Sequence, residues 1–451
     1  MNGDPRPARR LVPRPTTILL AALLSGCAHY AALPLAADPL LAPTIAVLDH
    51  PGAALPTGPL SVSDVVDLAL ANNPELKAAR LKRAIAAGQT KQASTLPNPS
   101  LTGAFLPLLS GVGTVPALNV GLGQDLKTLL TYRTRRRAAR DSEQQVAADV
   151  VWQEWQVTGQ ARQIASDLIV GRASRASYLA AYQLLAARNA KLEQALAARN
   201  VTLVTVAPDR VALQAARSAL NALDQKQLAL MHQLNALLGL APDVVVPLAT
   251  QVALPPFDPA AIRAGLATLP ERRPDLIALR MGYAAADEQV RQAIRSQFPD
   301  LVLGGSLSSD NSSVVNGGPT ATLSLPVFDR NQGNVAITQA TRAQLHADYA
   351  ARLASTVGTV GAMLREMEQL TAQLAEARRD LPAARLAAER AQAAFGASNL
   401  DERGYRHPPS NTLSTDPDLM PLQLALLDRQ IALQTLVGDG LPTVDTETTA
   451  Q

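Results

Sequence analysis

The residue types that carry most enzyme chemistry are few and far apart in this chain. Its 5 histidines stand at no metal-ligand spacing from one another or from the single cysteine. The sequence contains no phosphate-binding glycine loop, no nucleophile-elbow serine and no His-Glu-x-x-His zinc motif. We therefore expect no catalytic residues, no metal ligands and no enzyme activity.

The single cysteine, Cys27, indicates one covalent modification. A basic segment with several arginines precedes a short apolar run, Ile18–Leu24, which is too short to span a bilayer, since that takes about 20 apolar residues. This is the pattern of a secretory signal peptide. The run ends in Leu24-Ser25-Gly26-Cys27, which resembles the bacterial lipobox. We expect a signal peptide over 1–26 and acyl chains such as palmitate on Cys27, with no other cofactor; the alternative is a chance cysteine.

Outer-membrane sorting is expected from the next residue. Ala28 stands where lipoproteins of this class retained at the inner membrane usually carry aspartate. Residues 27–60 are rich in Ala, Pro and Leu, and this composition indicates a lipidated, extended leader.

The overall composition favours long helices and excludes a nucleic-acid partner. Hydrophobic residues make up 47% of the chain but aromatic residues only 3%, and most of the rest are alanine and leucine, which are strong helix formers. The 41 basic and 38 acidic residues give a net charge of only +3, so the chain lacks the basic surface that nucleic acids require.

One pattern occurs twice along the chain. Asn72-Asn73-Pro74-Glu75-Leu76 matches Arg272-Arg273-Pro274-Asp275-Leu276 at an offset of 200 residues. The same offset joins identical residues at Ala78, Arg80, Ala86, Gln89, Ala93, Pro99 and Leu101. Prolines cluster near 250–260. We predict a tandem duplication, with a first repeat over 61–250, a second over 260–440 and a disordered tail over 441–451.

Each repeat reads as a helix followed by a β-hairpin. The helices are expected near 62–95 and 260–297, where each stops at prolines. The hairpin strands are expected at 101–105 and 118–123, and again at 301–308 and 320–327 with a turn over 311–319. Apolar side chains alternate with Gly, Ser, Thr and Asn along these segments, which is the period of a strand.

A very long helix should follow each hairpin. No proline occurs over 117–207 or 327–381, and an apolar stripe from Leu345 to Leu374 recurs at helical spacing. A helix of about 65 residues would be roughly 100 Å long, which implies a coiled coil or a helical barrel. Return helices fit 208–239 and 417–438, each ending at a glycine, while Pro382 should kink or split the second long helix.

Four short strands cannot span a membrane alone, because the smallest closed barrels have about 8 strands. Three chains would supply about 12 strands and leave an open lumen. The apolar and polar faces then suit lipid outside and water inside. The alternative is an ordinary soluble hairpin with one buried face, which is the better interpretation of either hairpin taken alone.

The chain resembles the TolC-like outer-membrane efflux family over residues from about 60 to 438. The resemblance rests on residues 69–76, 273–276 and 298–301, and on 325–334, a segment that is most similar to the outer-membrane components of heavy-metal efflux systems. The family implies a mainly α fold with a small β part, in which a trimer forms a 12-stranded transmembrane β-barrel continuous with a periplasmic α-helical barrel. It also implies docking to a periplasmic adaptor and an inner-membrane pump.

The expected function is the outer-membrane channel of a tripartite efflux system. The alternatives are a type I secretion exit duct and a periplasmic coiled-coil scaffold or adaptor lipoprotein. At the expected periplasmic tips, Asp209 and Asp401 would form acidic rings at the aperture of a trimer, whereas Asp209 would equally suit an N-cap of the next helix. The exported substrate is set mainly by the pump.

Overall fold

The computed structural model describes residues 30–50, 58–253, 258–396, 415–438, 441–442 and 444. The chain divides into a unit over Met1–Leu41 and a unit over Ala42–Gln451. Every described helix and strand lies in the second unit, which is the part that the following paragraphs describe.

The first repeat folds as two short helices, a hairpin and two longer helices. Its elements are α2 (Val62–Asn72), α3 (Pro74–Ala93), β1 (Ser100–Leu106), β2 (Ala117–Asp125), α4 (Leu126–Ala197) and α5 (Leu203–Leu238). Ser61 begins α2 with a capping box, in which its side chain accepts from the Asp64 amide while Asp64 accepts from the Ser61 amide.

The second repeat has the same order of elements. They are α6 (Pro259–Gly265), the 3-10 turn η2 (Leu266–Thr268), α7 (Leu269–Arg272), α8 (Pro274–Arg295), β3 (Leu301–Ser309), β4 (Val315–Leu323), α9 (Gln332–Gly396) and α10 (Thr415–Val437). The prediction of a helix of about 65 residues after the second hairpin is confirmed by α9, which has 65.

The two repeats share an equivalent hydrogen bond between a short helix and the return helix. In the first repeat the side chain of Asn73 donates to the carbonyl of Leu237 at 3.0 Å, and in the second Arg273 donates to the carbonyl of Leu436 at 3.4 Å. Each bond ties the start of one helix to the end of the return helix of its own repeat. Both return helices then end at a left-handed glycine, with φ of 72° at Gly239 and 78° at Gly438.

The continuous helices expected over 62–95 and 260–297 are each interrupted, at Asn73-Pro74 and Arg273-Pro274. Proline lacks an amide hydrogen and forces the preceding residue into an extended conformation, so a new helix starts there. At the first break Asn73 accepts from the Leu76 amide at 2.8 Å and caps α3.

The second strand of the second hairpin lies earlier in the chain than predicted. This strand, β4, begins at Val315, not at 320, because the Asp310 side chain accepts from the amides of Ser312 and Val314 and closes the turn early. Pro319 therefore lies inside the strand, where its missing donor is tolerated because β4 is an edge strand. The sequence predicts a kink or split of the second long helix at Pro382. This residue lies within α9, which continues past it without a break to Gly396.

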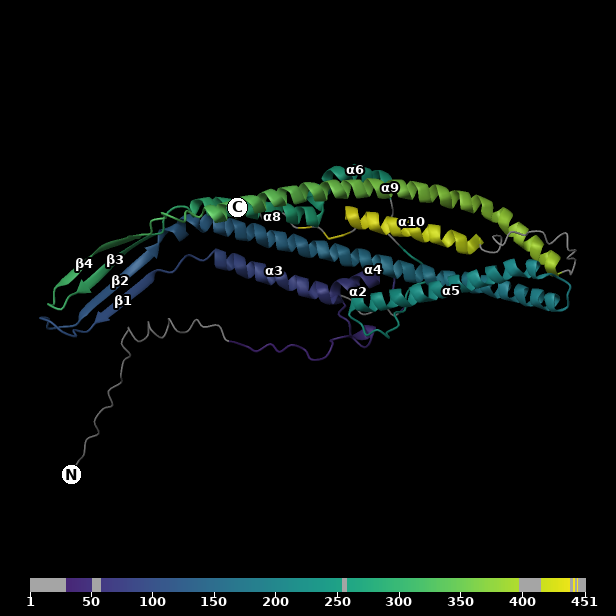
Figure 1. The fold of residues 1–451 in the computed structure, drawn as a ribbon, viewed down its shortest axis with the longest axis horizontal. Helices are drawn as coiled ribbons and strands as arrows, with labels where there is room; N and C mark the ends of the chain where they lie inside the picture. The colour runs from purple at the N-terminus through teal and green to yellow at the C-terminus, as the bar shows by residue number, and fades with distance from the viewer. Residues whose placement is uncertain are drawn as a thin grey trace, which may run out of the picture. The chain divides into compact units, whose positions relative to one another are not determined.

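In each repeat the short helices lie beside the long ones (Figure 1), and each repeat has its own hydrophobic core. In the first, α2, α4 and α5 pack together around Val65, Leu168 and Leu234. In the second, α6 and α7 pack on α9 and α10 around Leu269, Val360 and Leu433. The two repeats are joined because α8 and α10 of the second also pack against α4 of the first.

Part of the expected leader packs onto the first core. Ala42 forms a parallel bridge with Leu240, and Leu60 does so with Leu248. Between them the 3-10 turn η1 (Ile45–Val47) is followed by Leu48, which is buried in the first core. Residues 42–48 are therefore a fixed part of the folded unit.

Candidate functional site

The four strands form one antiparallel sheet in the order β1-β2-β3-β4, so the two hairpins lie side by side (Figure 1). The register pairs Leu101 with Leu122 and Val120 with Leu307. Since directly opposed residues share a face, the apolar side chains gather on one face of the sheet. They are Leu101, Phe105, Leu118, Val120, Leu122, Leu303, Leu307 and Leu323, all exposed.

The opposite face carries small and polar residues. The same register places Thr102 opposite Gly121, and Gly121 opposite Ser306. Two of its glycines have no room for a side chain: a Cβ at Gly121 would lie 2.7 Å from the Thr102 hydroxyl, and one at Gly304 would overlap the Leu122 carbonyl oxygen. The predicted division of the sheet into an apolar and a polar face is confirmed.

Both edges of this sheet are open in the protomer. Within the residues described here, β1 pairs only with β2, and β4 only with β3. An edge strand presents a row of unpaired backbone groups that can pair with another chain. The sheet is thus exposed on both faces and unpaired at both edges, which is unstable for an isolated domain and suits a closed assembly.

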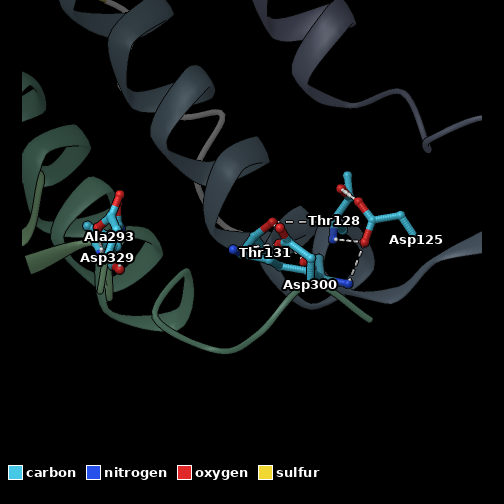
Figure 2. A network of polar contacts seen from close by, with 8 residues as sticks. Asp125, Thr128, Thr131, Ala293, Asp300 and Asp329 are labelled. Carbon is cyan, nitrogen blue, oxygen red and sulfur yellow. Dashed lines mark hydrogen bonds and ion pairs between the residues drawn. The ribbon is translucent and has the colours of Figure 1, made fainter. Parts of the chain in front are cut away.

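A polar network fixes the sheet to the long helices (Figure 2). Asp125, the last residue of β2, caps α4 by accepting from the Lys127 amide at 2.9 Å, and it also accepts from the Thr128 hydroxyl. The Lys127 ammonium lies 2.7 Å from the carboxylate of Asp300, which precedes β3. This ion pair joins the hairpins of the two repeats where strands give way to helices.

The segment over 325–334, which the sequence singled out, shapes the equivalent turn into α9. Asn331 has a left-handed φ of 60°, a conformation that asparagine tolerates better than most residues. Its amide donates to Asp329 at 2.8 Å and its side chain donates to the Ala293 carbonyl at 2.9 Å. The motif therefore has a structural role, because it ties the start of α9 to the end of α8.

Asp209 lies in α5, near the turn that joins α4 to α5. It is buried, and its Oδ1 lies 3.0 Å from Nη2 of Arg188 on α4. Because α5 begins at Leu203 with Thr202 as its N-cap, Asp209 is not the cap of this helix. Asp401 and Cys27, the other two predicted site residues, lie outside the described residues.

A buried ion pair escaped the sequence reasoning. Arg273 and Asp275 are 2% and 7% exposed, and the guanidinium donates to both carboxylate oxygens, at 2.9 and 2.6 Å. The Arg273 guanidinium also lies over the ring of Trp152 on α4, 4.7 Å from its centroid. Both charged residues belong to the repeated motif, so the duplication was the available signal for this contact.

Among the described residues no helix is long and apolar enough to cross a membrane. The same residues contain no group of three or more His, Cys, Asp or Glu side chains that would hold a metal ion.

The comparisons with known proteins agree on one fold. Residues 266–439 match the family model of outer membrane efflux proteins. The outer membrane channel CmeC of Campylobacter jejuni has a TM-score of 0.68 and 17% identity, covering 93% of this chain and 95% of that one. The outer-membrane channel OprN has a TM-score of 0.68 and 17% identity, covering 91% of this chain and 98% of that one. The open state of the Neisseria gonorrhoeae MtrE outer membrane channel has a TM-score of 0.61 and 17% identity, covering 92% of this chain and 100% of that one.

A search of curated protein sequences finds no match to the chain. The structural similarities extend over both repeats, while the family model matches the second. The chain therefore has the fold of these outer membrane channels, mainly helical with one small sheet, and its residues 266–439 match the outer membrane efflux protein family.

Proposed function

We propose that this chain is one protomer of a trimeric outer-membrane channel that passes substrates from a periplasmic adaptor and an inner-membrane pump out of the cell. The observation that carries the proposal is the two-faced sheet with open edges, in a chain whose second repeat matches the efflux family. The family consists of channel proteins rather than enzymes, which supports a transport role.

The sheet supports closure with other copies. If β4 of one copy pairs with β1 of the next, the edges disappear, and three copies give about 12 strands around an open lumen. The face with Val120 and Leu307 would then meet lipid, and the face with Gly121 and Ser306 would meet water.

The packing of the helices supports the same head-to-tail closure. In the second repeat α8 packs against its own α9 and also against α4, whereas α3 of the first repeat packs mainly against its own α4. By the duplication, α3 is equivalent to α8 and α4 to α9. The missing partner of α3 would therefore be α9 of a neighbouring copy, which is a heterologous contact that closes into a ring.

Lipid anchoring belongs to the same proposal. Cys27, freed by removal of 1–26, would carry the acyl chains that hold the leader in the outer membrane. At the other end Asp209 and Asp401 would line the periplasmic aperture. A type I secretion exit duct would share this fold, so purification with the native adaptor and pump separates the two roles.

The test uses neighbouring residues on opposite faces of β2. Val120 lies opposite Gly103 and Leu307 on the apolar face, and Asn119 lies on the other. Val120→Arg would place a cation in lipid, at a cost of about 2–4 kcal/mol near the bilayer midplane, and should greatly reduce insertion. Asn119→Arg should insert normally and shift single-channel conductance towards anions.

Native mass spectrometry of the wild-type protein in detergent should give three copies. A protein that stayed monomeric and conducted no ions in planar bilayers would overturn the channel. Equal insertion of the Val120→Arg and Asn119→Arg proteins would overturn the assignment of the lipid face.

A further inference from the structure

Two carboxylates from different repeats meet between the long helices. Asp167 lies on α4 and is buried, and Asp428 lies on α10. The return helix α10 runs antiparallel to α4 and packs on it (Figure 1), with the Thr435 side chain beside Gly159. Asp167 lies eight residues beyond Gly159 on α4, and Asp428 lies seven residues before Thr435 on α10, so the two carboxylates come close together between the helices. Two ionised carboxylates have no hydrogen to share, so this contact is favourable only when one of them binds a proton.

The unpaired atoms are consistent with a shared proton. The Oδ1 atoms of both Asp167 and Asp428 are buried, and neither has a hydrogen-bond donor among the described residues. A buried acceptor without a donor is costly. A proton bound to one Oδ1 atom and donated to the other gives both atoms a hydrogen-bond partner.

Charged groups on α5, α9 and α10 surround this pair. Lys226 of α5 lies 3.2 Å from Oδ2 of Asp167, and Arg429 of α10 lies 2.6 Å from Glu366 of α9. Each cation is therefore already engaged with a carboxylate other than Asp428. Burial, and then the nearby Asp167 carboxylate, raise the pKa of Asp428 to about 6, against a smaller lowering by Lys226 and Arg429.

Protons can reach the pair from solvent. A polar cavity of about 280 Å³ between α9 and α10 is lined by Asp428, Arg429, Glu366, Gln369 and Gln373, among others. Its lining of amides and charged groups suits water, which can carry a proton to the Asp428 carboxyl group.

We propose that Asp167 and Asp428 form a proton-binding site that holds α10 against α4 under acidic conditions and loosens this contact as the pH rises. Because α10 is the return helix of the second repeat, the site makes the contact between the repeats sensitive to the pH around the protein. The inference concerns contacts within one protomer and does not depend on the proposed channel function.

Loss of the proton from Asp428 makes the contact between α10 and α4 weaker at higher pH. The pKa of Asp428 in the folded protein lies above its ordinary value of 3.8. The stabilisation from the bound proton is therefore fully present below about pH 4, and it is lost as the pH rises through about 6.

The test is hydrogen exchange of the α10 amides in the full-length protein at pH 5 and pH 7.5, expressed as protection factors corrected for the intrinsic exchange rate. Protection in the wild-type protein should fall several-fold between the two values, at most about tenfold for a group that titrates near 6. In Asp428→Asn, whose neutral amide donates to Asp167 at any pH, protection at pH 7.5 should match that at pH 5.

Asp224→Asn is the matched control. Asp224 is an exposed residue of α5 that pairs with Arg175 at 2.6 Å, and that bond lowers its pKa, so it is ionised at both pH values. This variant should keep the wild-type fall in protection.

Asp167→Asn removes the other carboxylate of the pair. It replaces Asp428→Asn in this test if that variant folds poorly, and its α10 protection should likewise be equal at both pH values. Equal protection of α10 at both pH values in the wild-type protein would overturn the proposal, as would an Asp428→Asn protein that retained the full pH dependence.

Discussion

Replacing Arg273 by methionine should loosen the junction where the second repeat contacts α4. The guanidinium touches three groups: the Asp275 carboxylate in a two-pronged ion pair, the ring of Trp152, and the Leu436 carbonyl. Methionine keeps much of the apolar contact with the tryptophan but removes both charged hydrogen bonds. The Asp275 carboxylate would then remain buried without its main partner.

The cost can be estimated from what remains. Breaking a buried ion pair from one side typically costs about 3–5 kcal/mol. Two groups lessen the loss here, because the Leu276 amide donates to Asp275 at 3.0 Å and the Arg352 guanidinium lies 3.9 Å away. We therefore expect the lower end, about 3 kcal/mol per protomer, which is roughly a hundredfold in an opening equilibrium.

Hydrogen exchange at the start of α8 measures this opening directly. Protection of the amides from Leu276 to Arg280 should fall about a hundredfold in Arg273→Met. Arg272→Met, which changes the exposed neighbouring arginine, should leave protection unchanged. Adding Asp275→Asn to Arg273→Met should restore much of the loss. Unchanged protection in the single variant, or no recovery in the double variant, would refute a role for the buried charge pair.

Three further predictions follow from single sites. Gly239→Ala and Gly438→Ala should both lower the melting temperature, because a left-handed alanine adds at least about 1 kcal/mol of backbone strain to the folded state. The loss should be larger at Gly438, because its new Cβ would overlap the Trp155 ring, whereas the nearest atom at Gly239 is 3.4 Å away. Asp209→Ala should reduce cation preference in single-channel recordings if the residue lines the aperture, and unchanged selectivity would remove it. Mass spectrometry should find a diacylglycerol on Cys27, and an unmodified N-terminus at 28 or later would contradict lipidation.

Much of the architecture could be predicted from the spacing of apolar residues, because the two-residue period of strands and the 3.6-residue period of helices are easy to tell apart in this sequence. The strands alternate cleanly, as the pairing of Leu101 with Leu122 and of Leu303 with Ala321 shows. The long helices contain few prolines, and the end of α10 agreed with the position of Gly438. These signals are local, so they survive without knowledge of the tertiary contacts.

What sequence reasoning missed depended on side chains that meet across the fold. Nothing in the period of residues 311–323 indicates that Asp310 closes the second hairpin early, since that depends on its bonds to Ser312 and Val314. Likewise Asp167 and Asp428 are far apart in the sequence, and only the packing of α10 on α4 brings them together.

The two repeats differ most where one of them lacks a neighbour. Arg273 and Asp275 are buried beneath Trp152 because α4 covers the start of α8 within the same chain. The equivalent Asn73 and Glu75 line an open polar groove between α3, α4 and α5, and the Glu75 side chain is exposed. If the proposed trimer forms, α9 of a neighbouring copy would cover this groove as α4 covers α8. The contact between copies would then run along α3 and α5, and that is where substitutions should weaken assembly.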